Sequence, residues 1–303
     1  MNRHRSTAKP PPDARSEVLL PFTPPLDWAA FREFLGARAL SGVEQFDGDT
    51  YQRSFSFGGA AGTLSVAPRA GVDALELVVE GAADDVVTEI ARRVRQLFDL
   101  DADPAAISAK LSRDPRLRRA VAQRPGLRVP GAFEPFETSV RAILGQQVSV
   151  AAATTLAARL VHRFGRPLPA DAARGAITHL APDAATLARA DFSAFGVPQR
   201  RADAIQTFAR EIDSGRLRLG PADRVETTVE RLVELPGFGP WTAHYVAMRA
   251  CGERDAFPAG DLGVRRALGK GGELARDAES ERRSQRWRPY RAYAVMHLWM
   301  TPP

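Results

Sequence analysis

The residues best suited to chemistry lie in one short stretch near the end of the printed chain. A glycine hairpin, Leu235-Pro236-Gly237-Phe238-Gly239-Pro240-Trp241, is followed twenty residues after Trp241 by Asp261. Gly237 and Gly239 permit a tight turn with uncovered N–H groups, and Pro240 suits the first position of a following helix. The positive end of such a helix attracts phosphate. The stretch predicts a phosphate-binding hairpin with one carboxylate close behind it, although an isolated glycine turn before a core helix has the same local signature.

Helical periodicity surrounds the hairpin on both sides. We expect one helix over Val225–Leu235, a second over Trp241–Cys251 that ends at Gly252, and a short capped helix from Asp261 to Gly269. A helix–hairpin–helix binds the DNA backbone without reading its sequence, and the predicted donors are Gly237, Gly239 and Thr242. Asp261 is also suited to capping its own helix, and both roles are compatible because the helix end favours the ionised carboxylate.

The charge of the chain is unevenly distributed. Residues 1–113 hold 13 Lys and Arg against 16 Asp and Glu, whereas residues 114–303 hold 29 against 20. The second part therefore carries +9 and the first part −3. A basic surface fits nucleic acid, since each neutralised phosphate releases counterions. A merely soluble, arginine-rich protein would show the same excess.

Composition excludes several classes of site. Cys251 is the single cysteine, so the sequence excludes an internal disulfide, a cysteine-rich zinc site and a four-cysteine iron–sulfur cluster within this chain. We find no membrane span and expect a reducing, cytoplasmic setting. Residues 1–17, which are basic and contain Pro10-Pro11-Pro12, are expected to form a disordered tail.

Two structural regions are expected after the tail, in an α+β fold. Residues 18–113 mix helical spacing with two-residue alternation, as in Leu75, Leu77 and Val79, and predict a small helix-backed antiparallel sheet. Residues 114–303 show helical spacing almost throughout and predict an all-helical region in two lobes. A break at Gly145–Ser149 divides the run from Phe136 to Phe164, and Ser149 is suited to capping the second helix.

Two motifs together resemble a known family. They are Phe133-Glu134-Pro135-Phe136-Glu137-Thr138-Ser139-Val140-Arg141-Ala142-Ile143-Leu144-Gly145-Gln146-Gln147-Val148-Ser149-Val150 and the stretch from Leu235 through Val264, with a weaker third at Arg288 to Trp299. The chain resembles the helix–hairpin–helix DNA glycosylases, specifically the AlkA-type 3-methyladenine glycosylases, over roughly residues 18–303. The resemblance implies an N-terminal α/β domain of the AlkA kind followed by a helix–hairpin–helix glycosylase domain.

The resemblance makes Asp261 the catalytic residue. Cleavage of an N-glycosidic bond develops oxocarbenium character on the sugar, which a nearby carboxylate stabilises while it orients or deprotonates water. A target base must first leave the duplex. Trp241, Tyr245 and Trp299 align with aromatic positions of the family's base pocket, where ring faces attract a cationic alkylpurine. An aromatic on a helix is otherwise more often part of the core.

Further roles follow only from the resemblance. Gln147 falls at the position of the residue that fills the gap left by the flipped nucleotide, although an exposed glutamine at a helix start needs no such role. The family binds Na⁺ or K⁺ through hairpin carbonyls, here those of Val233, Leu235 and Gly237. No other cofactor is implied. Family members that also cut the strand carry a lysine where this chain has Trp241, so the resemblance implies a monofunctional hydrolase.

The expected function is excision of 3-methyladenine, 7-methylguanine and related alkylated purines from double-stranded DNA in base excision repair. We expect a monomer in the cytoplasm, associated with the nucleoid if the source is bacterial. The alternatives are a non-catalytic helix–hairpin–helix DNA-binding protein and a glycosylase for uracil or deaminated purines.

Overall fold

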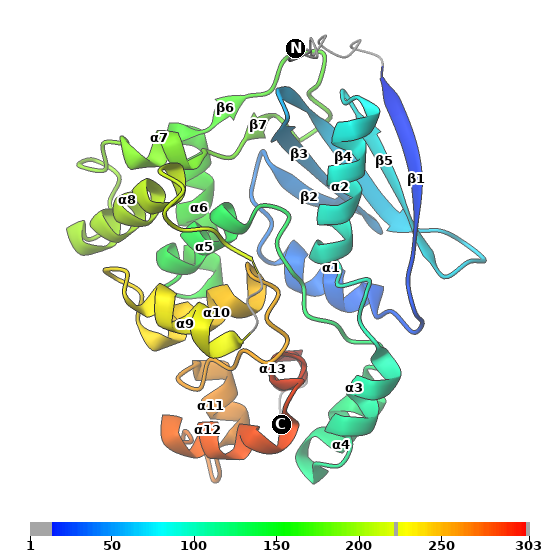
Figure 1. Ribbon diagram of the computed structural model, residues 1–303, viewed down its shortest axis with the longest axis vertical. Helices are drawn as coiled ribbons and strands as arrows, with labels where there is room; N and C mark the ends of the chain where they lie inside the picture. The colour runs from blue at the N-terminus through cyan, green and yellow to red at the C-terminus, as the bar shows by residue number, and fades with distance from the viewer. Residues whose placement is uncertain (1–13, 221–223, 301–303) are drawn as a thin grey trace, which may run out of the picture.

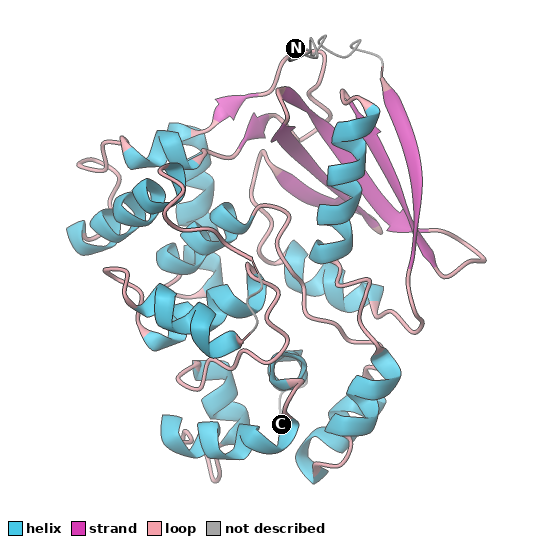
Figure 2. Ribbon diagram, viewed as in Figure 1, coloured by secondary structure: helices cyan, strands magenta, loops and turns pink. Residues whose placement is uncertain are grey.

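The computed structural model describes residues 14–220 and 224–300. The strands gather in one region, and helices make up most of the rest (Figure 1). In Figure 2 the sheet is confined to one side of the molecule, apart from a small two-stranded ribbon.

The strands are β1 (Arg15–Pro21), β2 (Glu44–Asp47), β3 (Thr50–Phe57), β4 (Ala60–Pro68), β5 (Ala74–Glu80), β6 (Arg166–Pro167) and β7 (His179–Leu180). The first helices are α1 (Trp28–Gly36), α2 (Asp84–Leu97), α3 (Pro104–Leu111), α4 (Pro115–Gln123), α5 (Pro135–Leu144), α6 (Val150–Phe164), α7 (Ala184–Ala188) and α8 (Gln199–Asp213). The later helices are α9 (Val225–Val233), α10 (Pro240–Arg249), α11 (Leu262–Leu268), α12 (Asp277–Ser284) and α13 (Arg291–Met300), with a 3₁₀ turn, η1, at Gln285–Trp287.

The main sheet is antiparallel, with strand order β1-β5-β4-β3-β2. Its two-residue alternation places Leu75, Leu77 and Val79 of β5 in the core. Helix α2 crosses the sheet in Figure 1 and buries one apolar face that includes Ile90 and Val94. The predicted helix-backed antiparallel sheet is therefore confirmed, and the α+β class with it.

Several predicted boundaries need correction. Residues 15–17 of the predicted tail form the start of β1, because β1 pairs with β5 from Arg15 opposite Glu80. Ala14, just before β1, accepts a hydrogen bond of 2.8 Å from Gly81 N, and residues 1–13 lie outside the described residues. The division at residue 113 separates α3 from α4, yet Leu111 and Leu117 are buried in the same core as the sheet. The region after residue 114 also contains the β6–β7 ribbon, whose two-residue strands are too short to show alternation.

Two hydrophobic cores organise the fold. One joins the sheet with α1 to α4, α11 and α13, and the other joins α5 to α10. Helix α10 contributes to both, through Ala247 and Met248 on one side and Ala243 and Val246 on the other. Helix α10, which follows the glycine hairpin, is thus packed between the two cores. This packing fixes the positions of the side chains on its first turns.

No helix in the described ranges, 14–220 and 224–300, combines the length and apolar character needed to cross a membrane.

Candidate active site

The glycine hairpin joins α9 to α10 as the sequence predicts. Gly237 has φ +85°, and a Cβ added there would lie 2.4 Å from the Cβ of Ala204 in α8. This residue must therefore be glycine for two independent reasons, its backbone conformation and its close approach to a neighbouring helix. Gly239 caps α10, and no heavy atom would meet a Cβ there within 4 Å. The hairpin thus packs at Gly237 against α8, in the core of α5 to α10, while the space around Gly239 is unoccupied by other described residues.

The predicted donors of the hairpin differ in accessibility. Among residues 14–220 and 224–300, the N–H groups of Gly237, Gly239 and Thr242 donate to no carbonyl. The Thr242 side chain, however, is only 2% exposed, and its hydroxyl accepts a hydrogen bond of 2.9 Å from Gln146 Nε2. The Thr242 hydroxyl is therefore engaged inside the fold, while the Thr242 N–H has no acceptor among the described residues.

The Asp261 carboxylate accepts three hydrogen bonds, one of which is the predicted helix cap. It caps α11, with Oδ1 accepting from Val264 N at 3.0 Å. The same oxygen accepts from Trp299 Nε1 at 2.8 Å, and Oδ2 accepts from Trp241 Nε1 at 3.0 Å. Three donors thus fix the plane of the carboxylate. Oδ1 accepts two of these bonds and Oδ2 only one, so Oδ2 retains a free lone pair.

The three aromatic residues predicted for the base pocket do lie together. The Trp241 and Tyr245 ring centroids are 5.4 Å apart, and those of Tyr245 and Trp299 are 6.2 Å apart. Since carbon atoms in contact lie about 3.5–4.0 Å apart, a base between two parallel rings needs about 7 Å. A base would therefore stack on an outer face of this cluster rather than enter between these rings.

Three residues that the sequence analysis did not select complete the cluster. Phe34 of α1 stacks on Trp299 with centroids 6.0 Å apart and an interplanar angle of 12°. The guanidinium of Arg38 lies 3.8 Å from the Phe34 ring centroid, and that of Arg249 lies 4.7 Å from it. Arg249 Nη1 also donates to the Tyr245 hydroxyl at 3.0 Å. The site thus combines four rings with two cations.

Burial dominates the electrostatics of the two cations. It lowers the pKa of Arg38, while the Tyr245 hydroxyl and Asp261 act in the opposite direction. Burial likewise lowers the pKa of Arg249, against the effect of Tyr245. Both guanidiniums lie close to aromatic faces of the cluster, where their positive charge would interact with the charge of a bound group.

Gln147 lies in the loop between α5 and α6. It is exposed and has φ +58°, a conformation that costs a non-glycine residue free energy and is often found at functional sites. Its neighbour Gln146 fixes the loop, because Gln146 Nε2 donates to Gly237 O at 2.8 Å and Arg201 Nη2 donates to Gln146 O at 2.7 Å. The loop carrying Gln147 is therefore attached directly to the glycine hairpin. Ser149 caps α6 as predicted.

A buried ion network joins the sheet to α5, the helix that precedes this loop. Arg53 of β3 bonds Glu137 at 2.9 Å, and Arg141 bonds Glu44 at 2.7 Å. Burial alone would raise the pKa of Glu44, but the charges of Arg141 and Arg53 lower it. Arg141 also donates to the carbonyl of Arg38. The sheet domain is thereby connected to the loop carrying Gln147 and to the cation beside Phe34.

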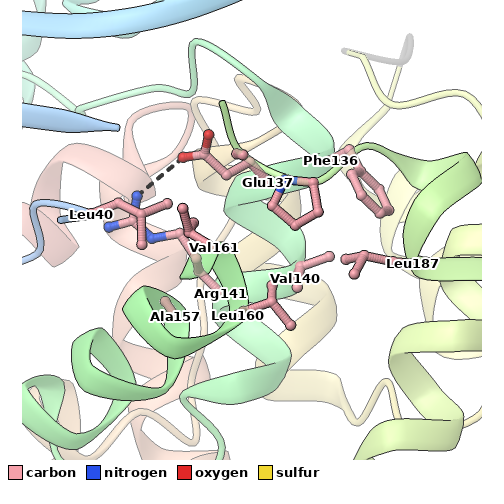
Figure 3. A pocket seen from close by; sticks show the side chains of 11 residues that line it. Leu40, Phe136, Glu137, Val140, Arg141, Ala157, Leu160, Val161 and Leu187 are labelled. Atoms are coloured by element: carbon pink, nitrogen blue, oxygen red, sulfur yellow. Dashed lines mark hydrogen bonds and ion pairs between the residues drawn. The ribbon is translucent and has the colours of Figure 1, made fainter. Parts of the chain in front are cut away.

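The hollow shown in Figure 3 is lined mainly by residues of α5, α6 and α7, and Asp261 is not among them. Its volume is about 10 Å³, room for roughly one water molecule. Apolar side chains such as Val140 and Leu160 line it beside the Glu137–Arg141 pair. It is a packing defect of the second core and cannot hold a base.

The cation predicted at the hairpin depends on three carbonyls, and two of these already accept hydrogen bonds. Leu235 O accepts from Phe238 N at 3.0 Å, and Gly237 O accepts from Gln146 Nε2 at 2.8 Å. A carbonyl oxygen has two lone pairs, so both remain able to bind a monovalent cation. Within the described residues no group of three or more His, Cys, Asp or Glu side chains is placed to hold a metal ion.

Some of the residues that the sequence analysis did not select had a sequence signal, and others had none. Arg249 continues the four-residue spacing of Trp241 and Tyr245 along α10, so extending that face would have found it. Gln146 lies inside a motif that was selected. Phe34 and Arg38 have the same spacing near the start of the chain, but no sequence pattern relates them to α10 or α13.

Comparison with known proteins identifies the family of this chain. Residues 17–134 match the AlkA N-terminal domain family, and residues 140–292 match the family described as HhH-GPD superfamily base excision DNA repair protein. The first match extends past the predicted boundary at residue 113 and includes α3 and α4. Fold and site thus define a helix–hairpin–helix protein of the base excision repair class. The chain belongs to the HhH-GPD superfamily, in the group that carries an AlkA N-terminal domain.

Two relatives and one solved structure are similar to this chain over most of its length. It is 34% identical over 285 residues to "DNA-3-methyladenine glycosylase 2" of Escherichia coli K12, covering 93% of this chain and 96% of that protein. It is 39% identical over 282 residues to "Probable bifunctional transcriptional activator/DNA repair enzyme AlkA" of Mycobacterium tuberculosis H37Rv, but spans only 56% of that protein. The solved 3-methyladenine DNA glycosylase from Archaeoglobus fulgidus shares the fold, with a TM-score of 0.76 at 22% identity, covering 94% and 97% of the two chains.

Proposed function

We propose that this chain is a monofunctional DNA glycosylase that removes alkylated purines from double-stranded DNA. The observation that carries the proposal is the Asp261 carboxylate, oriented by two indole N–H groups within an aromatic cluster and attached through α10 to an open glycine hairpin. The name of the Escherichia coli relative supports the substrate class.

In the proposed mechanism, DNA phosphates bind the N–H groups of Gly237, Gly239 and Thr242 at the positive end of α10. Gln147 projects from the adjoining loop and occupies the gap left by the flipped nucleotide. The extruded base stacks on an outer face of the cluster of Trp241, Tyr245 and Trp299. This arrangement brings the sugar to Asp261.

Asp261 then stabilises the oxocarbenium character of the sugar as the base leaves. The free lone pair of Oδ2 is available to orient or deprotonate the attacking water, because Oδ1 already accepts two hydrogen bonds. An N-alkylated purine leaves without strong acid assistance since it is already cationic. The products are the free base and an abasic site.

Water, rather than an enzyme amine, is the proposed nucleophile. Trp241 stands where a strand-cutting relative would need its lysine, and the indole there bonds Asp261 instead. The one lysine after residue 113 is Lys270, nine residues beyond Asp261. Borohydride should therefore trap no covalent complex with DNA, and a trapped adduct would refute this part of the mechanism.

The proposal includes two further expectations from the family resemblance. A Na⁺ or K⁺ ion would bind the carbonyls of Val233, Leu235 and Gly237 and would stiffen the hairpin against phosphate, with no part in the chemistry. The enzyme would act as a monomer.

The two cations of the cluster favour a second substrate class. Arg38 and Arg249 hold positive charge near the rings, which opposes a cationic base and suits a neutral purine that presents a carbonyl acceptor. Deaminated purines have such an acceptor. A glycosylase for deaminated purines is therefore the alternative, and a broad enzyme would take both.

Release of free bases distinguishes these possibilities. Methylated DNA and hypoxanthine-containing DNA are incubated with the protein, and the released bases are resolved by chromatography. The proposal predicts 3-methyladenine and 7-methylguanine from the first substrate. Hypoxanthine release alone would favour the alternative, and no release from either DNA would leave a non-catalytic DNA-binding protein.

A further inference from the structure

Gly263 is the second residue of α11 and lies beneath the indole of Trp299. A Cβ added to it would lie 2.9 Å from Trp299 Cδ1, 3.2 Å from Trp299 Nε1 and 3.1 Å from Asp261 Oδ1. Its φ is outside the left-handed region, so the backbone does not require glycine here. Within a helix, alanine would be favoured over glycine by roughly 0.5–1 kcal/mol. Glycine at this position therefore needs another explanation.

We propose that Gly263 is a positioning residue, whose missing side chain lets the Trp299 indole lie against α11 and hold the Asp261 carboxylate. Asp261 Oδ1 accepts from both Trp299 Nε1 and Val264 N. A Cβ on residue 263 would lie close to this oxygen and to Trp299 Nε1, the donor of the first bond. The inference rests on the proposed role of Asp261.

Two neighbouring rings restrict the movement of the indole away from a larger residue. The Phe34 ring centroid lies 6.0 Å from that of Trp299, with Phe34 only 2% exposed, and the Tyr245 ring centroid lies 6.2 Å from it. Arg38 and Arg249 in turn cover the Phe34 ring. An alanine at position 263 must therefore displace Trp299, the carboxylate or α11 itself, and each of these displacements disturbs the bond of 2.8 Å between Trp299 and Asp261.

The consequence for excision follows from orientation. Displacing a catalytic group by about 1 Å can cost about 100-fold in rate. DNA binding through the hairpin should be unaffected, because the three atoms nearest a Cβ at position 263 belong to Trp299 and Asp261 and none belongs to the hairpin. The Gly263→Ala variant should thus lose about 100-fold in the single-turnover rate constant of base release while keeping its Kd for DNA.

Gly260→Ala is the matched control. A Cβ at Gly260 would meet only the carboxylate of Asp277, at 3.1 Å; that side chain is 62% exposed and can turn toward solvent at the cost of its ion pair of 3.2 Å with Arg265. The two substitutions are chemically identical and three residues apart. Excision by Gly260→Ala should stay within about twofold of wild type, since the group nearest the added Cβ is a solvent-exposed carboxylate that does not bond Asp261 or Trp299.

Indole N–H resonances test the inference independently of activity. All four tryptophans donate hydrogen bonds: Trp28 to Asp49 O, Trp287 to Asp114, and Trp241 and Trp299 to Asp261. In ¹⁵N-tryptophan protein, Gly263→Ala should move the Trp299 N–H signal upfield and leave Trp28 and Trp287 unchanged. Assignment comes from Trp299→Phe, which removes that signal.

A double-mutant cycle completes the test. In the Trp299→Phe background the bond is already absent, so adding Gly263→Ala should cost less than about threefold in rate. An unmoved Trp299 signal, or equal costs of Gly263→Ala in both backgrounds, would overturn the inference. If wild-type protein released no base, the proposed function would fail, while the indole signal would still decide whether Gly263 positions Trp299.

Discussion

Replacing Arg53 with methionine tests whether the buried ion network holds the sheet to α5. Arg53 is 3% exposed, bonds Glu137 at 2.9 Å and lies 3.7 Å from Glu44. Methionine retains much of the apolar volume of the side chain but removes its charge. The two carboxylates would then share only Arg141.

The expected loss follows from this geometry. Removing one partner of a buried ion pair typically costs about 3–5 kcal/mol, because the remaining charge is left without compensation. Arg141 remains 2.7 Å from Glu44 and 3.3 Å from Glu137 and offsets part of that cost. We therefore expect the lower end, a loss of about 3 kcal/mol in the free energy of unfolding.

Urea denaturation at pH 7 measures this loss. Arg32→Met is the control, because Arg32 pairs with Asp49 at 2.6 Å while the two side chains are 50% and 69% exposed. An exposed pair of that kind contributes less than about 1 kcal/mol. If Arg53→Met cost no more than Arg32→Met, the network would not be what joins the sheet to α5.

Three further predictions concern the hairpin, a buried histidine and the cysteine. Gly237→Ala should lower the free energy of unfolding by more than about 1 kcal/mol and weaken DNA binding, because Gly237 has φ +85° and an added Cβ would clash with Ala204. Gly239→Ala should remain as stable as wild type in the same urea experiment. Burial lowers the pKa of His297 to about 4 from an ordinary 6.5, so between these pH values the imidazole is neutral in the folded state and protonated in the unfolded state. The free energy of unfolding should therefore fall by at most about 3 kcal/mol as pH decreases from 6.5 toward 4. His297→Leu should flatten that pH dependence, and identical slopes for the two proteins would contradict the assignment. Burial raises the pKa of Cys251 to about 12, so a thiol reagent should label the native protein only through unfolding, and rapid labelling at pH 8 would show the thiol to be accessible.

The site was predictable to the extent that its residues are close in sequence. Trp241 and Tyr245 share one helical face, and Asp261 follows after a short connection, so local spacing was sufficient to place them together. The family resemblance supplied Trp299. Phe34 and Arg38 reach the site only because α1 packs into the core that also contains α13, and no local pattern contains that tertiary contact.

Burial was the other property that sequence did not reveal. Thr242 follows the hairpin and is polar, which suggested a phosphate donor, yet Gln146 occupies its hydroxyl inside the fold. Arg53 and Glu137, 84 residues apart, gave no sign that they form a buried pair. The fold class followed from periodicity, whereas strand β1 and the boundary after α4 depend on long-range pairing and packing.

The most direct test of the central claim compares wild-type protein with Asp261→Asn on methylated DNA. Asparagine keeps the size of the side chain and one oxygen to cap α11, but removes the negative charge that the mechanism requires. We predict that wild-type protein releases 3-methyladenine, that the variant loses at least about 100-fold in single-turnover rate, and that its Kd for DNA is unchanged. Base release by Asp261→Asn at the wild-type rate would contradict the account.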